Sequence, residues 1–210
     1  MNKLFEDART GRVLAIGAHP DDVEVGAGGL VARLAEEGAE VTIGVVSVPT
    51  LLCERVREAE EAARRLSAKV VMLHPEQLMR VEDIPMHQLV RRLDQLVGDV
   101  QPDLVITHAE SDLHWDHGLV NRATISALRR TPCDLLAYHS SMEMNAQTRS
   151  LGACFADIGE TIECKLAAIA AHRSQLAKMD LESTRDLAKA MGRISGFRYA
   201  EAYEVLRLRI

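Results

Sequence analysis

Two short segments of the chain, 18–24 and 108–117, are dense in side chains that bind metal ions or transfer protons. Apart from His108, which ends an expected strand, they hold three of the eight histidines and four aspartates: His19, Asp21, Asp22, Asp112, His114, Asp116 and His117. A catalytic zinc site needs about three protein ligands from His, Asp or Glu, and one open position for water. The two segments therefore predict a metal site, provided that the fold brings them together.

The spacing in the first segment suggests how two ligands could converge. His19 and Asp22 flank a short turn that Pro20 restricts, and a tight turn at the start of a helix could aim both side chains at one point. Two residues cannot hold a catalytic metal, so we expect a third ligand from the second segment, where His117 would open the next helix. Asp21 lies beside a ligand and could face the bound water.

The remaining pair in the second segment has its own interpretation. His114 and Asp116 could form a hydrogen-bonded pair in which the carboxylate fixes the imidazole tautomer. The alternative is that Asp21, Asp22 or Asp116 simply caps a helix, as single aspartates at such places usually do. The density of both clusters favours a metal site. Spacing alone does not identify the reaction, and a His, His, Asp set suits zinc or iron.

Short apolar runs alternate with longer helical patterns along the chain. We expect strands over 13–17, 41–48, 70–73, 104–107 and 135–138, and helices over 25–37, 54–66, 118–130 and around 89–97. Farther on we expect helices over 160–175 and 181–194 and a strand over 202–208. Nearly continuous apolar strands are typical of a parallel sheet covered on both faces. The pattern predicts a single α/β domain over residues 1–210, with three layers and a Rossmann-like, mostly parallel sheet.

This fold class explains why the two segments attract attention. In open α/β sheets, ligands gather at the carboxyl ends of the strands. The first segment directly follows the first expected strand, and the second follows the fourth. We therefore expect both segments at the functional edge of the sheet.

Composition indicates which partners the protein is not expected to bind and in which compartment it is expected. The 210 residues carry a formal net charge of -6 without a dense Lys/Arg run, so nucleic acid is not an expected partner. No apolar run approaches the roughly 20 residues of a membrane span, and no signal peptide is expected at the N-terminus. The four cysteines are scattered, which favours a reducing, cytoplasmic location over a disulfide framework.

At these residues the chain resembles the LmbE/PIG-L superfamily of zinc-dependent N-deacetylases. The signature A-H-P-D-D-x-E followed by G-x-G-G appears at 18–24 with Gly26, Gly28 and Gly29. The signature D-x-H-P-D-H appears at 112–117, with Trp115 in the place of the proline. Weaker matches are R-x-x-E-A at 55–59 and Y-A-E at 199–201. The resemblance covers nearly the whole chain.

The resemblance implies a Rossmann-like fold and a set of catalytic roles. The implied zinc ligands are His19, Asp22 and His117. Asp21 would be the general base that takes a proton from metal-activated water. His114, protonated and oriented by Asp116, would stabilise the oxyanion or supply a proton.

The resemblance also implies a substrate and its contacts. The activity would be removal of an N-acetyl group from a small amino-sugar conjugate such as an N-acetylglucosaminide. Arg55 would reach substrate hydroxyls, Trp115 would stack on a sugar ring or merely pack, and Asp112 would border the substrate. Members of the superfamily are often homo-oligomers, so we expect the same here.

Other classes remain open at this point. A nucleotide-dependent oxidoreductase would fit the sheet, but the glycines over 26–29 do not form G-x-G-x-x-G, and Ser47 ends the second strand without an acidic ribose partner. An iron oxygenase could use the same ligands, although we expect those enzymes on antiparallel folds. A carbohydrate-binding protein without catalysis would not need Asp21, and a zinc amidase could act on a non-sugar amide.

The other histidines carry weaker expectations. His139 follows the fifth strand and could line the site, although a half-exposed structural role is as plausible. His74, His87 and His172 are expected at the surface or in packing. His108 ends the fourth strand and has no assigned role.

Overall fold

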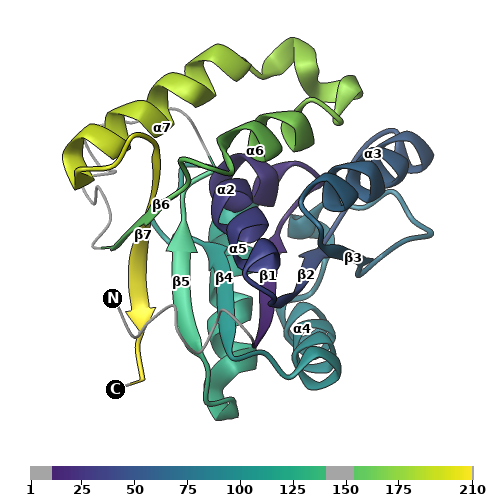
Figure 1. Ribbon diagram of the computed structural model, residues 1–210. Coiled ribbons are helices and arrows are strands. Elements are labelled where there is room, and N and C mark those ends of the chain that lie inside the picture. The colour runs from purple at the N-terminus through teal and green to yellow at the C-terminus, as the bar shows by residue number, and fades with distance from the viewer. Residues whose placement is uncertain (1–10, 141–153, 210) are drawn as a thin grey trace.

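The computed structural model describes residues 11–140 and 154–209, and the seven strands found there form a single sheet with the order β3-β2-β1-β4-β5-β7-β6 (Figure 1). Five neighbouring strands pair in parallel: β1 (Arg12–Gly17), β2 (Glu40–Val45), β3 (Lys69–Met72), β4 (Leu104–His108) and β5 (Asp134–Tyr138). Antiparallel pairs join β7 (Ala200–Arg207) to β5 and to β6 (Cys154–Asp157). The mostly parallel α/β sheet confirms the predicted fold class.

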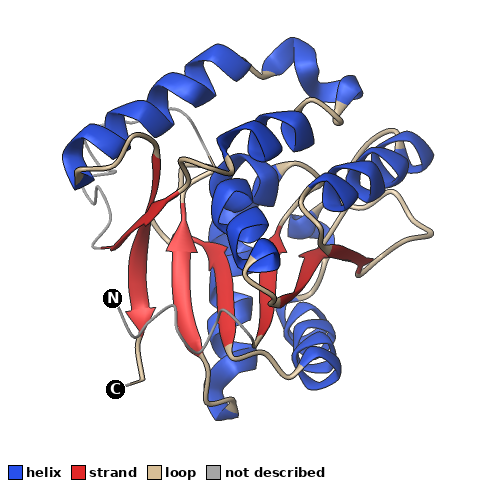
Figure 2. Cartoon of the chain, in the orientation of Figure 1, coloured by secondary structure: helices blue, strands red, loops and turns tan. Residues whose placement is uncertain are grey.

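Helices cover both faces of the sheet (Figure 2). One layer contains α2 (Asp22–Glu36), α3 (Leu52–Arg65), α6 (Ile162–Ile169) and α7 (Leu181–Ser195). The other contains α4 (Met86–Val100) and α5 (Trp115–Ala127). Short 3-10 turns complete the described chain: η1 (Val81–Asp83), η2 (Leu128–Arg130) and η3 (Arg173–Lys178).

The central strand β1 shows how the apolar pattern produces three layers. Val13 and Ala15 belong to the core under α2 and α3, whereas Leu14 and Ile16 belong to the core under α4 and α5. All four side chains are fully buried. Alternate side chains of a strand point to opposite faces, so a strand covered on both sides must be apolar throughout.

Glycines in α2 allow this helix to pack unusually close to its neighbours. A Cβ added at Gly26 would lie 1.9 Å from Cδ2 of Tyr138, and one at Gly29 would lie 2.6 Å from Cγ2 of Ile158. The Glu201 carboxylate accepts hydrogen bonds from the backbone amides of Gly29 and Leu30, at 2.9 and 2.8 Å. The glycine-rich and Y-A-E segments therefore meet, and the close approach of backbone and side chain explains the small residues.

The structure differs from the sequence-based expectation mainly near the C-terminal half. The helix expected over 160–175 ends at Ile169, because His172 adopts φ -79° and ψ 62°, outside the helical region, before η3 begins. The short antiparallel strand β6 was not expected. Conversely, α2 begins at Asp22 rather than at residue 25, which places this carboxylate in its first turn.

The single domain over residues 1–210 stays a prediction. The homo-oligomer does so as well. Within residues 11–140 and 154–209, no helix combines the length and apolar character that crossing a membrane requires.

Candidate active site

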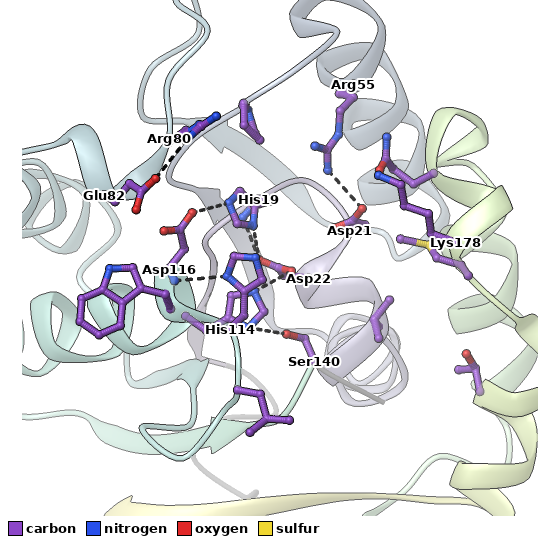
Figure 3. A pocket seen from close by; sticks show the side chains of 18 residues that line it. His19, Asp21, Asp22, Arg55, Arg80, Glu82, His114, Asp116, Ser140 and Lys178 are labelled. Carbon is purple, nitrogen blue, oxygen red and sulfur yellow. Dashed lines mark hydrogen bonds and ion pairs between the residues drawn. The ribbon is translucent and has the colours of Figure 1, made fainter. Parts of the chain in front are cut away.

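The two segments singled out in the sequence meet at one edge of the sheet. The first follows β1 and the second follows β4, and these strands are parallel neighbours. A cavity of about 800 Å³ opens at this edge, and Figure 3 shows the side chains that line it. Because parallel neighbours end on the same side, residues about 90 positions apart in the chain become adjacent.

Three predicted metal ligands form a compact group in this cavity. One ligand atom from each of His19, Asp22 and His117 lies within 4.8 Å of the others. The Asp22 carboxylate stands between the two rings, 3.6 Å from His19 Nδ1 and 3.4 Å from His117 Nε2. The geometry brings together one carboxylate and two imidazoles, which is a usual donor set for a catalytic divalent cation.

Each imidazole of this group has its other ring nitrogen on a carboxylate. Nε2 of His19 lies 3.0 Å from Oδ2 of Asp116, and Nδ1 of His117 lies 2.9 Å from Oδ1 of Asp112. In each ring the outer nitrogen is the one that faces Asp116 or Asp112, and the inner nitrogen is the one that faces Asp22. A carboxylate that accepts the outer N–H fixes the tautomer and leaves the inner nitrogen with a free lone pair. Both inner nitrogens here face Asp22, as metal-binding histidines require.

The charge of the site also suits a cation. Burial alone would lower the pKa of His117, but hydrogen bonds to Asp112 and Asp22 raise it to about 10. Such a shift reports a strongly negative local potential, which a bound divalent cation would neutralise. The donor set, the outer carboxylates and the charge therefore fit a metal, and His, His, Asp accommodates zinc or iron.

Asp21 lies beside this group without capping a helix. It precedes α2 with φ 98°, a conformation that is strained for a residue with a side chain, and it makes no side-chain cap hydrogen bond. Nη2 of Arg55 donates to its Oδ2 at 3.2 Å and to the Pro20 carbonyl at 2.8 Å. Burial, and then the negative charge of Asp22, raise the pKa of Asp21 to about 7, while Arg55 opposes the shift.

Asp22 does not act as a simple cap either. Its Oδ2 accepts a hydrogen bond from the backbone amide of His19 at 2.8 Å, which closes the tight turn that Pro20 was expected to restrict. The helix-cap interpretation of these aspartates is therefore wrong for both Asp21 and Asp22.

The expected partnership of His114 and Asp116 takes a different form. The backbone amide of Asp116 donates to Nδ1 of His114 at 3.2 Å, while the Asp116 carboxylate turns to His19 (Figure 3). A ring nitrogen that accepts an N–H carries no hydrogen, so His114 is a neutral ring with its hydrogen on Nε2. Burial, and then the charges of His117 and His19, lower its pKa in agreement with this form. The carboxylate-bound imidazolium expected from the sequence is corrected accordingly.

The three expected substrate-binding residues lie in different surroundings. Trp115 begins α5 at the cavity, and 66% of its surface is exposed. Arg55 is only 5% exposed and its Nη2 contacts Asp21 and Pro20, but the residue also lines the cavity, so its contact with substrate hydroxyls stays a prediction. Asp112 lies beneath the cavity, where it contacts His117 and accepts from the backbone amides of His114 and Ser140. Asp112 is not among the side chains that line the cavity, and its expected contact with the substrate stays a prediction.

Two residues near the metal group were not assigned roles from the sequence. His108 is fully buried and stacks on His117 with 3.9 Å between ring centroids, while its Nε2 accepts from the Ala18 amide at 3.0 Å. Oγ of Ser140 lies 3.1 Å from His117 Nδ1 and borders the cavity. The position of His108 at the end of the fourth expected strand could have indicated a role at the site. Nothing in the sequence pointed to Ser140.

His108, Asp112 and His117 form a second compact group of possible ligand atoms, all buried. This group shares His117 with the first, and in it Asp112 contacts Nδ1 of His117 while the Ala18 amide donates to Nε2 of His108. The weaker candidate His139 lies 3.2 Å from Glu204 and does not line the cavity.

Comparison with known proteins gives the class of enzyme. The chain is 26% identical to a probable N-acetyl-alpha-D-glucosaminyl L-malate deacetylase of Bacillus cereus, over 82% of this chain and 86% of that protein. It shares its fold with the N,N'-diacetylchitobiose deacetylase of Pyrococcus horikoshii, with a TM-score of 0.79, 23% identity, and coverage of 98% of this chain and 86% of that one.

The fold by itself does not determine the reaction. The structure of a 4-carboxy-2-hydroxymuconate hydratase from Pseudomonas putida matches with a TM-score of 0.77 and 22% identity, over 95% of this chain and 97% of that one. The sequence family is more specific: the model described as PIG-L, GlcNAc-PI de-N-acetylase, matches residues 14–128, more than half of the chain. The chain belongs to the PIG-L family and is an enzyme of its deacetylase class, the hydrolases that cleave amide bonds.

Proposed function

We propose that this enzyme removes the N-acetyl group from an amino-sugar conjugate such as an N-acetylglucosaminide, with a divalent cation held by His19, Asp22 and His117. The observation that carries the proposal is the pair of outer carboxylates, Asp116 and Asp112, which turn the inner nitrogens of both imidazoles toward Asp22. The family match and the relatives that act on N-acetylglucosamine conjugates support the choice of reaction and substrate.

The cation is proposed to be zinc, with iron as the alternative. When bound, a zinc ion supplies a Lewis acid and lowers the pKa of water at the site to about 7. Alanine variants of the three ligands should each lose most of the metal measured by elemental analysis of the purified protein. His87→Ala, an exposed histidine on α4, is the matched control and should keep its metal.

Asp21 is proposed to be the general base. Its carboxylate borders the cavity beside Asp22, and burial holds its pKa near 7, where a carboxylate can both accept and release a proton. The water proton would pass to Asp21 as the water attacks the acetamide carbonyl. The C–N bond then breaks, acetate leaves, and the amine nitrogen takes up a proton from Asp21.

His114 is proposed to stabilise the negative charge that develops on the carbonyl oxygen. The backbone contact at Nδ1 leaves the Nε2–H of His114 as a hydrogen-bond donor within the cavity. Trp115 offers an exposed aromatic face at the rim, on which a sugar ring could stack.

A substrate panel tests the proposed function. Acetate release should be measured on free N-acetylglucosamine, several of its glycosides and simple non-sugar acetamides, and we expect the glycosides to react fastest. Equal activity on simple acetamides would reject the amino-sugar and leave an amidase. Tight glycoside binding with no acetate release from any compound would instead indicate a metal-dependent carbohydrate-binding protein.

A further inference from the structure

His172 is the buried histidine that the proposed mechanism leaves without a role. It lies in the turn between α6 and η3, its side chain has no exposed surface, and neither ring nitrogen makes a hydrogen bond among the described residues. Its Nε2 lies 3.3 Å from Oε1 of Glu24, which is also buried. A leucine or phenylalanine would fill the same space without burying two ring nitrogens, so packing alone does not account for this residue.

The surroundings of His172 are acidic and lead to the proposed base. Burial opposes the charged form, yet the pKa of His172 is raised by Glu24 and further by the charges of Asp21 and Glu58. Glu24 is one helical turn beyond Asp21 along α2, and Glu58 is one turn beyond Arg55 along α3. His172 therefore contacts Glu24, which lies one turn along α2 from Asp21, the residue that pairs with Arg55.

The turn that carries His172 is fixed to α3 as well. Glu58 accepts hydrogen bonds from the backbone amide and the hydroxyl of Ser174, at 2.8 and 2.6 Å. Gln175, the next residue, lines the same cavity as Asp21. The ring of His172 is thus held at a defined place between α2 and α3.

Asp21 needs such support because its backbone is strained. A residue with a side chain at φ 98° costs on the order of 1–3 kcal/mol and persists only where its surroundings hold it. Arg55 holds the carboxylate from one side. Without His172, the buried Glu24 carboxylate would lose the ring that faces it at 3.3 Å, one helical turn from the Asp21 carboxylate, and repulsion between the two carboxylates would be less well opposed.

We infer that His172 is a positioning residue for the reaction: with Glu24 it holds Asp21 in the geometry from which Asp21 removes a proton. This inference rests on the proposed role of Asp21. His172 does not line the cavity and is not part of the metal group, so it would act through Asp21. Its replacement should lower kcat and leave KM and metal content nearly unchanged.

The test is a double-mutant cycle on the full-length, metal-loaded enzyme, with acetate release as the readout. His172→Leu should lower kcat roughly 10- to 100-fold, the scale on which supporting residues act in such sites. His172→Gln, whose amide can donate to Glu24, should recover part of the loss. In the Asp21→Asn background, His172→Leu should change kcat by less than about two-fold, because a residue that acts through Asp21 has nothing left to position.

The controls separate this inference from the proposed function. His87→Gln should behave as wild type, and Tm should be recorded for each protein. The same loss from His172→Leu with and without Asp21 would overturn the positioning role, as would wild-type kcat in His172→Leu. If His172→Leu does not fold, His172→Phe takes its place in the cycle, and wild-type kcat in that variant would overturn the positioning role. A fully active Asp21→Asn would overturn the proposed base itself.

Discussion

Oδ2 of Asp116 lies 3.0 Å from Nε2 of His19, a residue 97 positions earlier in the chain. This contact joins the two chemically dense segments and orients a proposed metal ligand rather than His114. The prediction is that Asp116→Ala weakens metal binding roughly 10- to 100-fold, the usual effect of removing such an outer carboxylate. Competition with a chromogenic chelator measures the affinity.

A matched control for this variant is Glu110→Ala, an exposed carboxylate in the same segment, 108–117. It should bind metal as the wild type does. Unchanged affinity in Asp116→Ala together with lowered turnover would instead restore the sequence-based interpretation, in which the carboxylate serves His114.

His114→Ala should lower kcat and change KM little. The Nε2–H of His114 is proposed to meet charge that develops only in the transition state, so its removal costs on the order of 100- to 1,000-fold in kcat. Steady-state kinetics on an N-acetylglucosaminide measure both constants. His139→Ala, which does not line the cavity, is the control. A change confined to KM would reassign His114 to substrate positioning.

Arg55→Ala should also act on kcat rather than on KM, because its guanidinium contacts Asp21 and Pro20. A misplaced base can cost roughly 100-fold, and we expect a loss on the order of 10- to 100-fold with the metal retained. Arg57→Ala, exposed on the same helix, should be neutral. If KM rises while kcat holds, Arg55 contacts the substrate as the family resemblance implied.

Gly26→Ala should destabilise the fold. The added Cβ would lie 1.9 Å from Cδ2 of Tyr138, whose side chain is fully buried and cannot move away. Overpacking of this kind costs about 1–3 kcal/mol or more of the free energy of unfolding, measured by urea denaturation. Gly118→Ala in α5, where a Cβ meets nothing within 4 Å, is the control and should be neutral or stabilising. Equal stability of the two variants would contradict the close packing of α2.

The sequence predicted those parts of the molecule that depend on local pattern. Fully apolar strands such as Val13–Gly17 implied a sheet covered on both faces, and the carboxyl ends of parallel strands placed His19 and His117 on one edge. These inferences needed only the order of the elements and the direction of the strands. The family signatures added the class of reaction, which the family match confirms.

The errors concern features that depend on side-chain direction in three dimensions. Whether the Asp116 carboxylate reaches His114 or His19 is decided by a rotamer and by the approach of β1 to β4, neither of which spacing contains. The family resemblance assigned Arg55 to the substrate, and that assignment stays a prediction; its contact with Asp21, 34 residues earlier, could not be read from the spacing. The end of α6 at Ile169 was likewise not visible in the pattern, and the ring of His172, three residues later, lies beside Glu24 of α2.

Metal removal followed by acetate-release measurement tests the central claim most directly. The enzyme should lose acetate release from an N-acetylglucosaminide when a chelator strips the metal, and should recover it when Zn²⁺ is restored. Asp21→Asn should take up the same metal and stay on the order of 100- to 10,000-fold slower, because the proposed base is gone. Acetate release that persists without metal, or near-normal turnover in metal-loaded Asp21→Asn, would contradict this account.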